Sequence, residues 1–353
     1  MKRLLLVGAG HAHCVALRAF ADSPLYGARV TVVSPHDMEI YSAMLPGLVA
    51  GHYRRSEAEI DVARLVSNAY AEFVRGEVAA LDLSRRTVKL RDGRDIGFEF
   101  VSLNPGSLVD RSLPGAEHAL PARPFGDFYA RLGAPRRVAV IGAGAGGAEL
   151  AMALRWRGAA VTLYSAQPTL PPALAQRVLL ALRRLGVDFR PGMAVDAIEP
   201  GPVVVAGSSH QEFDLAVLAT GAVAPGWPRA AGLATDAQGW VLVDTKLRSL
   251  SHPQVFAAGD CAALQDAAHP KSGVYAVRHG EVLAQNLRHA VNDRPLVDYR
   301  PQARSLLLLS CGGRTAIAAR GGWSAQGWWA WRWKNWIDRR WVRSFSALGH
   351  DLS

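Results

Sequence analysis

Three glycines at the GxGxxG spacing are the clearest chemical signature in this chain. Gly142, Gly144 and Gly147 follow the apolar run 138–141 and lead into helix-forming residues. Gly142 allows a tight turn, Gly144 leaves room for a pyrophosphate beside the backbone, and Gly147 lets the helix pack close to the strand. The N-terminus of that helix then faces the phosphates. The stretch therefore predicts a strand–loop–helix unit that binds a dinucleotide.

A partial copy of this pattern stands at the N-terminus. The apolar run 4–7 leads into Gly8 and Gly10, and His13 occupies the place of the third glycine. Two such units in a chain of 353 residues indicate two bound dinucleotides. Enzymes that need two dinucleotides carry a flavin and a nicotinamide.

The length of the chain predicts two domains and a C-terminal extension. Half of the residues are hydrophobic, which is enough for large cores. No uninterrupted apolar run reaches the roughly 18 residues of a membrane-spanning helix. The apolar residues 1–7 run directly into the first glycine loop, so we interpret them as a strand and not as a signal peptide.

Cysteine usage and charge restrict the class of protein further. Cys14, Cys261 and Cys311 form no CxxC pair, which fits a reducing, cytoplasmic compartment and argues against a dithiol active site. The formal net charge of +10 favours anionic surfaces without choosing between nucleic acid and membrane. No nucleic-acid motif is present, so we expect no nucleic-acid partner, and we expect no metal site.

The elements after the first loop follow a nucleotide-binding plan with one departure. A helix is predicted to about Phe20, followed by a strand over 28–34. That strand usually ends in an acid that holds the ribose hydroxyls, and here Ser34 stands there. Residues 41–48 are predicted as an apolar loop with a Pro-Gly turn. The short-strand pattern over 73–103 predicts a small antiparallel sheet.

The second unit shows the same departure. Its strand over 160–164 ends at Tyr164 and Ser165, where neither a carboxylate for NADH nor a guanidinium for NADPH stands. Coenzyme preference therefore stays open. We further predict a connection over 115–135, helices over 173–185 and 273–290, strands at 203–205, 215–218 and 305–309, and an apolar strand at 255–260 that ends in Gly-Asp.

The order of these motifs resembles one superfamily. GxGxxH, GxGxxG, Ala-Thr-Gly at 219–221 and Ala-Ala-Gly-Asp at 257–260 resemble the two-dinucleotide reductases of the pyridine nucleotide–disulfide oxidoreductases. Within it, the chain is similar to type II NADH dehydrogenases. Residues 10–13, 41–51 and 336–341 carry a closer likeness to the related flavoprotein module found fused to selenide, water dikinase.

This resemblance implies a fold class and a division into domains. The fold is expected to be α/β, with two Rossmann-like domains that bind FAD and NAD(P), small antiparallel sheets and a C-terminal extension. The FAD-binding domain is expected to be discontinuous, over residues 1–115 and 232–295. Residues 116–231 would bind NADH or NADPH, and 296–353 would form the C-terminal region.

The resemblance also implies the roles of individual residues. Asp260 would hydrogen-bond the ribityl chain of FAD, Val78 would lie by the adenine, and residues 270–273 would start a helix aimed at the flavin pyrimidine. Glu149 would lie close to the nicotinamide and the flavin; a favourable acid in the first helical turn is the alternative. We predict Glu149 and Lys271 as catalytic residues. The predicted cofactor-binding residues are Gly8, Gly10, His11, Ala12, Ser34, Met44, Val78, Gly106, Gly142, Gly144, Gly147, Gly221, Gly259 and Asp260.

The expected activity is hydride transfer from NADH or NADPH to FAD, followed by transfer of two electrons to an acceptor. A quinone is the favoured acceptor. Val274 and Arg278 stand where type II dehydrogenases carry glutamines beside the quinone, and the paired cysteines of the disulfide reductases are absent. Two alternatives remain open: a sulfur- or selenium-linked reductase, and a redox-sensing flavoprotein that does not depend on turnover.

The C-terminal tail is rich in tryptophan and basic residues. Seven of the ten tryptophans lie between Trp323 and Trp341. On a helix, Trp329, Trp333, Trp336 and Ile337 would share one face, with Trp341 at its edge. Indole rings and cations suit the headgroup layer, so the tail predicts a peripheral helix at the cytoplasmic face of a membrane. Packing against the body or against a second copy in a homodimer is the alternative. The interleaved basic residues are Arg332, Lys334, Arg339, Arg340 and Arg343.

Overall fold

The first glycine loop follows the central strand of a five-stranded parallel sheet in the computed structural model, which describes residues 1–353 except 168–169, 267–270, 303–304 and 347–353. Every neighbouring pair in this sheet is parallel, so the carboxyl ends of its strands meet at one edge. The strand order is β21 (Val255–Ala257), β9 (Phe100–Leu103), β1 (Lys2–Val7), β2 (Ala28–Ser34) and β5 (Glu72–Arg75).

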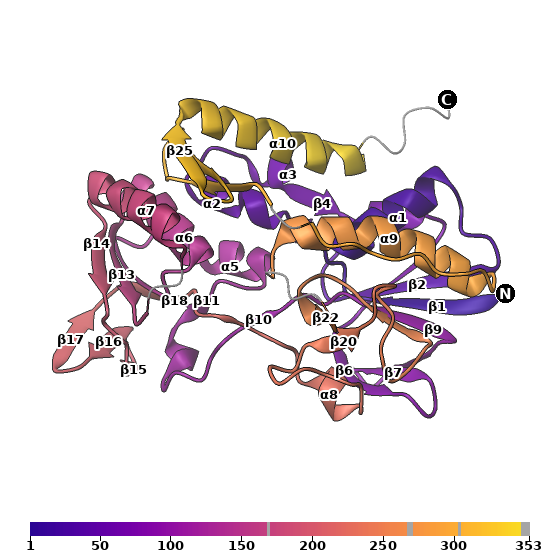
Figure 1. Cartoon of the computed structure of the whole chain (residues 1–353). Coiled ribbons are helices and arrows are strands. Elements are labelled where there is room, and N and C mark those ends of the chain that lie inside the picture. Colours follow the sequence, from indigo (N-terminus) through magenta and orange to yellow (C-terminus); the bar gives the residue numbers. More distant parts are fainter. Residues whose placement is uncertain (168–169, 267–270, 303–304, 347–353) are drawn as a thin grey trace.

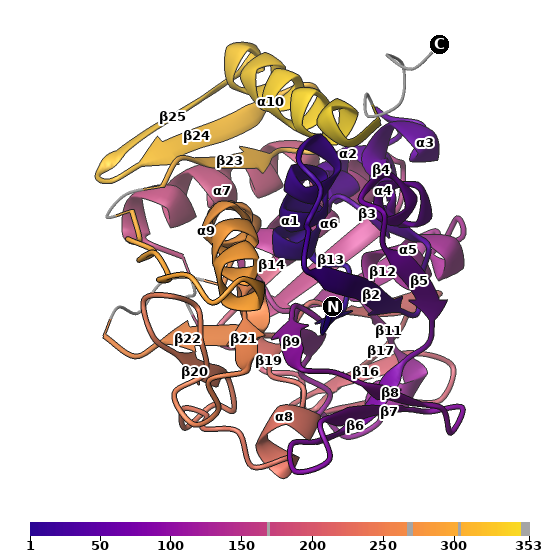
Figure 2. The same ribbon diagram turned by 90° about the vertical axis from the view of Figure 1, so that its right-hand side faces the viewer.

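Two long helices pack against each other beside this sheet. They are α1 (His11–Asp22) and α9 (Gly273–Val291), which lie side by side in Figure 2. Gly280 allows their close approach, because a Cβ there would lie 2.5 Å from Val15 Cβ. The N-termini of both helices therefore reach the edge of the sheet where the strands end. Helix α4 (Val62–Asn68) packs against α1.

The second glycine loop follows the central strand of another five-stranded parallel sheet. Its order is β11 (Leu120–Pro121), β18 (Leu215–Leu218), β12 (Arg137–Ile141), β13 (Ala160–Ser165) and β14 (Asp188–Pro191). The associated helices are α5 (Phe125–Arg131), α6 (Ala145–Trp156) and α7 (Pro172–Leu185). The strand β11 and the helix α5 lie within the stretch that the sequence predicted only as a connection.

Two three-stranded antiparallel sheets precede the C-terminal region among the described residues. They are β6 (Val78–Asp82), β7 (Thr87–Leu90) and β8 (Asp95–Gly97), and β15 (Ala197–Glu199), β16 (Val203–Ala206) and β17 (Ser209–Glu212). The prediction of one antiparallel sheet over 73–103 is thus wrong at its ends, because β5 and β9 belong to the first parallel sheet. Short apolar runs do not show which sheet they join.

The prediction of a loop over 41–48 is also wrong, because the chain there is largely helical. A 3₁₀ turn, η1 (Ser42–Met44), leads into α2 (Leu45–Val49). Pro46 stands in the first turn of α2, where a missing N–H costs nothing. The remaining short elements are β3 (Met38–Ile40), α3 (Arg55–Ala58), β4 (Glu59–Asp61), β10 (Leu108–Val109), η2 (Ala116–His118), β19 (Ala222–Val223), α8 (Trp227–Ala230), β20 (Val241–Val243), η3 (Gly259–Cys261) and β22 (Ala262–Leu264).

The C-terminal region forms an antiparallel sheet and a long outer helix. The sheet consists of β23 (Leu307–Ser310), β24 (Ala316–Arg320) and β25 (Trp323–Gly327), and the helix is α10 (Trp328–Ser346). Figure 1 shows α10 at the top of the molecule, above α2 and α3. Its inner side buries Ala330, Lys334, Asp338, Val342 and Phe345. Across the described residues, no helix combines the length and apolar character needed to cross a membrane.

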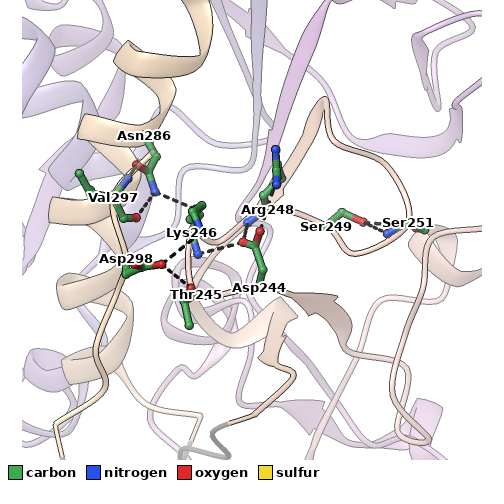
Figure 3. A network of polar contacts seen from close by, with 9 residues as sticks. All are labelled: Asp244, Thr245, Lys246, Arg248, Ser249, Ser251, Asn286, Val297 and Asp298. Atoms are coloured by element: carbon green, nitrogen blue, oxygen red, sulfur yellow. Dashed lines mark hydrogen bonds and ion pairs between the residues drawn. The ribbon is translucent and has the colours of Figure 1, made fainter. Parts of the chain in front are cut away.

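A polar network fixes the far end of α9 (Figure 3). Asn286 donates from Nδ2 to the carbonyls of Lys246 and Val297 at 2.8 and 2.9 Å, and its Oδ1 accepts the Val297 N–H at 2.8 Å. Asp244 accepts the N–H groups of Lys246 and Arg248, both at 2.9 Å. The network ties the turn after β20 and the segment after α9 to the helix, so the position of α9 relative to the sheet is fixed.

Candidate functional site

The first glycine loop packs tightly against the end of β9. Gly8 has a φ of +86°, and a Cβ there would lie 2.5 Å from the carbonyl oxygen of Asn104. A Cβ on Gly10 would lie 2.5 Å from Asn104 Oδ1. Helix α1 has no side-chain cap and no acid in its first turn. An anion is the natural partner of such a helix start, so the loop fits the pyrophosphate of FAD.

His13 explains why the loop needs no third glycine. Its ring bonds the carbonyl of Gly8 at 2.6 Å and Ser102 Oγ at 2.8 Å. Burial lowers the pKa of His13 to about 4, so the imidazole is neutral. The side chain of His13 is larger than that of a glycine, but it fits because it makes these hydrogen bonds in the interior beside the first parallel sheet.

Asn104 joins three parts of the site, and sequence reasoning did not select it. Its Oδ1 accepts the His13 N–H at 3.1 Å, and its Nδ2 donates to the Ala258 carbonyl at 2.7 Å. Gly259 has a φ of +68°, and a Cβ there would lie 2.4 Å from Asn104 Nδ2. The buried amide therefore holds the glycine loop and the ends of β9 and β21 in one arrangement. The sequence showed Asn104 only as the end of a strand.

Asp260 lies at the carboxyl edge of the first sheet with two polar neighbours. It accepts from Arg123 Nη1 at 2.9 Å and from Ser107 Oγ at 3.1 Å. Ser107 follows Gly106, which has a φ of +77° and open space where a Cβ would lie. The predicted residues Gly106, Gly259 and Asp260 are thus brought together. Arg123 was not predicted, because it reaches the site from a different stretch of the chain.

An aromatic cluster covers the start of α1. The ring of His11 stands edge-on to Tyr41 and to Trp341, with centroids 5.3 Å apart in both cases. Tyr41 and Trp341 stack at 4.2 Å. Burial lowers the pKa of His11 to about 4 and keeps its ring neutral. Trp341 of α10 therefore reaches the first glycine loop, which the spacing of the tail did not indicate.

Other predicted flavin contacts lie in different surroundings. Ser34 is buried at the end of β2, where its Oγ accepts the His36 N–H at 3.3 Å. Val78 begins β6 and is half-buried. Ala12 and Met44 are fully buried, and Met44 belongs to the core around α2 and α6. The assignment of Ala12, Ser34, Met44 and Val78 to the cofactor site stays a prediction.

The second glycine loop has the geometry that its spacing predicts. Gly142 has a φ of +108°, and a Cβ on Gly147 would lie 1.9 Å from the carbonyl oxygen of Gly142. Gly144 precedes α6, which has no side-chain cap and no acid in its first turn. The loop therefore fits a second pyrophosphate. The exposed Gly221 lies after β18, and its carbonyl accepts the Asp110 N–H at 3.0 Å.

Glu149 is the fifth residue of α6, and its side chain points to the C-terminal region. Its Oε1 accepts the Ser310 N–H at 2.7 Å. Burial raises the pKa of Glu149 to about 7, and the charge of Lys334 opposes that rise. Glu149 lies beyond the first turn of α6, so the alternative role as a first-turn acid is not supported.

Lys334 and Asp338 form a buried ion pair beside Glu149. Lys334 Nζ lies 2.7 Å from Asp338 Oδ2 and donates to the Ala43 carbonyl at 2.7 Å. The exposed fractions of their side chains are 6% and 5%. Sequence reasoning counted Lys334 among the surface cations of the tail and did not consider Asp338. Their separation of four residues is compatible with pairing on a helix but does not show that the pair is buried.

Lys271 stands just before α9 and is partly withdrawn from water. Its ammonium lies 4.6 Å from the centroid of the Trp240 ring and donates to the Ala262 carbonyl. Burial lowers the pKa of Lys271, although the ammonium also lies near Asp260. Ser272 precedes α9, which has no side-chain cap and no acid in its first turn. Pro270, the first residue of the predicted helix start, lies outside the described residues.

The three cysteines are free and buried. Burial raises the pKa of Cys261 and of Cys311 to about 12 and that of Cys14 still further. None is therefore a thiolate at neutral pH, so none has the reactivity of a catalytic cysteine.

Residues 2–280 match the family model described as pyridine nucleotide-disulphide oxidoreductase. The chain belongs to this family. It is 27% identical to ferroptosis suppressor protein 1 of Taeniopygia guttata over 67% of this chain and 68% of that protein. It is 32% identical to the nitric oxide reductase FlRd-NAD(+) reductase of Aeromonas hydrophila over 53% of this chain, and it spans about half of that relative (51%).

The solved structure of the sulfide:quinone oxidoreductase from Aquifex aeolicus superposes with a TM-score of 0.78. The superposition covers 99% of this chain and 92% of that one at 16% identity, so it shows a shared fold. The predicted α/β fold with two dinucleotide-binding units is confirmed. The chain is an FAD-dependent NAD(P)H oxidoreductase that passes electrons to a further acceptor. The closer likeness to the module fused to selenide, water dikinase stays a prediction.

Proposed function

We propose that this enzyme is an NADH:quinone oxidoreductase that works at a membrane surface. The proposal rests on the different residues that α10 places on its inner side and on its outer side. Its inner side brings Lys334 and Asp338 to Glu149. Its outer side exposes tryptophans, as a reductase of a lipid-soluble acceptor requires. One helix thus connects the reactive centre with the surface from which a quinone arrives.

In this proposal, the first glycine loop binds FAD and the second binds the nicotinamide coenzyme. Residues 1–115 and 232–295 hold FAD, with Asp260 on the ribityl chain and Arg123 holding that carboxylate in place. Residues 116–231 hold the nicotinamide coenzyme. When bound, FAD would supply the redox chemistry, as a hydride acceptor that can pass two electrons on to the acceptor. Lys271 and the uncapped start of α9 stabilise negative charge beside it.

Reduction of a quinone takes up two electrons and two protons. The hydride from the nicotinamide brings both electrons and one proton, and the proposed source of the second proton is the cluster beside α10. Glu149 has a pKa of about 7, so its carboxyl exchanges a proton readily at neutral pH. Lys334 Nζ is held by the Ala43 carbonyl and by Asp338. Asp338 orients the ammonium beside Glu149, and Glu149 supplies the proton to the acceptor.

The outer face of α10 supports contact with a membrane. Trp329, Trp333 and Trp336 are 38%, 41% and 58% exposed, although large aromatic side chains gain from burial. Trp341 instead packs against Tyr41, so the alternative of internal packing holds for that residue. Exposed indole rings interleaved with cations suit the headgroup layer of a cytoplasmic membrane face.

The sulfur- or selenium-linked alternative receives no support from the site. It calls for a reactive thiol near the flavin, and all three cysteines are buried with raised pKa values. For the coenzyme, we propose a weak preference for NADH, since Tyr164 and Ser165 at the end of β13 offer neither a carboxylate nor a guanidinium.

Sedimentation with anionic vesicles tests the proposed membrane contact. Because the inner side of α10 belongs to the core, substitution is preferable to truncation. The triple variant W329S/W333S/W336S should lose vesicle binding at low salt and still oxidise NADH with a water-soluble quinone. The control is W156S, which removes a 51% exposed tryptophan from α6 and should bind vesicles normally. A full-length protein that stays in the supernatant at low salt would contradict the proposal.

A further inference from the structure

A groove of about 800 Å³ runs along the outer flank of α10. We call it the arginine groove, because five of its lining residues are arginines, four from α10 and one from the turn between β23 and β24. The other principal lining residues are three tryptophans of the same helix. The arginines are Arg314, Arg332, Arg339, Arg340 and Arg343.

Most of this positive charge has no negative partner in the described part of the chain. Arg339 pairs with Glu57 at 2.6 Å and also donates to Asn335. No carboxylate among the described residues forms an ion pair with the other four arginines. A concentration of uncompensated guanidinium groups in a concave surface attracts an anion.

Tryptophan rings support three of the guanidinium groups. Arg314 lies 5.8 Å from the centroid of Trp331, Arg332 lies 5.7 Å from Trp328, and Arg340 lies 5.4 Å from Trp336. A ring beneath a guanidinium restricts its motion without using its N–H donors. These donors form a planar fork that matches two oxygens of a phosphate group. The chemistry of the groove therefore favours phosphate over a diffuse negative charge.

The position of the groove on α10 indicates what carries that phosphate. Successive residues are 100° apart on a helix, so the groove lies next to the exposed tryptophan face described above. The two surfaces share Trp336, and Arg340 of the groove lies over its ring. A ligand that fills both presents a phosphate on one side and an apolar chain on the other. Glycerophospholipids have this structure.

We propose that the arginine groove is a discrete binding site for the phosphate headgroup of an anionic phospholipid. The inference rests on the proposed membrane function of α10 and adds a specific ligand to it. General attraction to a negative surface requires only charge, whereas this site selects phosphate and holds one lipid in a defined place. An acidic electron-carrier protein is the competing occupant, and it would need no apolar chain.

The first measurement uses a soluble lipid in the absence of a membrane. The holoenzyme is titrated with dihexanoyl-phosphatidylglycerol below its critical micelle concentration, and tryptophan fluorescence is followed. We expect a saturable change with one lipid per chain and a much weaker change with dihexanoyl-phosphatidylcholine. A linear response without saturation would overturn the proposal.

The second measurement compares vesicles of equal zeta potential, made anionic with phosphatidylglycerol or with oleate. The wild type should prefer the phosphatidylglycerol vesicles. The variant R332Q/R340Q should lose that preference and bind them on the order of 30-fold more weakly, at about fivefold for each cation lost from the surface. The charge-matched control R157Q/R183Q removes two exposed arginines, one directly after α6 and one from α7, and should behave as the wild type.

The outcomes separate this inference from the proposed function. Equal binding to both kinds of vesicle, or unchanged binding by R332Q/R340Q, would overturn the lipid site. If that variant instead loses only the reduction of an acidic iron–sulfur protein, the groove belongs to a protein partner. Turnover of a water-soluble quinone without vesicles reports on the proposed function alone, so either proposal can fail while the other stands.

Discussion

Asp260 is the residue on which retention of the flavin should depend most directly. Arg123 and Ser107 hold its carboxylate at the carboxyl edge of the first sheet. Replacing Asp260 with Ala removes the partner of a buried ribityl hydroxyl and should weaken FAD binding by about 1–3 kcal/mol. Equilibrium dialysis of the purified holoenzyme measures this loss. The control D266A removes an exposed carboxylate nearby in the chain and should keep its FAD. If D260A retains stoichiometric FAD on dilution, the assignment is wrong.

Glu149 should make the stability of the protein depend on pH. Its pKa is about 7 in the folded protein and 4.5 as a free side chain, so the folded state binds the proton more tightly. The free energy of unfolding should therefore fall as pH rises from about 4.5 to about 7, by up to about 3 kcal/mol. The variant E149Q removes this titration. Its unfolding midpoint relative to the wild type should rise between pH 5 and pH 8, and a difference independent of pH would contradict the assigned pKa.

At the scale of elements, the start of α6 should control the reaction with the nicotinamide. Gly144→Val places a branched side chain where the pyrophosphate approaches, so flavin reduction by NADH should slow by on the order of 100-fold or more while FAD stays bound. Gly146→Ala is the matched control, because no heavy atom lies within 4 Å of a Cβ there. Rapid mixing with NADH measures both variants. Normal reduction in G144V would place the coenzyme elsewhere.

The attachment of α10 should depend on its buried ion pair. Lys334→Met leaves Asp338 buried without its cation and should cost about 3–5 kcal/mol of stability. The double variant K334M/D338L replaces the pair with apolar side chains and should recover most of that loss. Urea unfolding of the two variants provides the comparison. Equal destabilisation in both would show that the pair does not act as a unit.

These elements also show how far the sequence could predict the site. The glycine loops and the strand over 28–34 were predictable, because local spacing and apolar runs determine them. Asn104, Arg123 and Lys334 were not, since each becomes part of the site only through contacts with distant segments. The strands β5 and β9 were misassigned for the same reason, because their partners lie far away in the sequence.

In the whole molecule, the C-terminal region reaches both nucleotide-binding units. Trp341 contacts the first glycine loop through His11, and Lys334 approaches Glu149 on the helix of the second loop. The outer side of the same helix carries the exposed tryptophans and the arginine groove. In the proposed function, the acceptor reaction and the membrane surface therefore lie on opposite sides of this helix.

The proposed quinone reductase is tested most directly by sequential anaerobic mixing of the holoenzyme, first with NADH and then with a quinone. We expect NADH to remove the absorbance of oxidised flavin, and the quinone to restore it within the turnover time of the enzyme. Flavin that NADH reduces but that no quinone reoxidises would contradict the proposed quinone reductase.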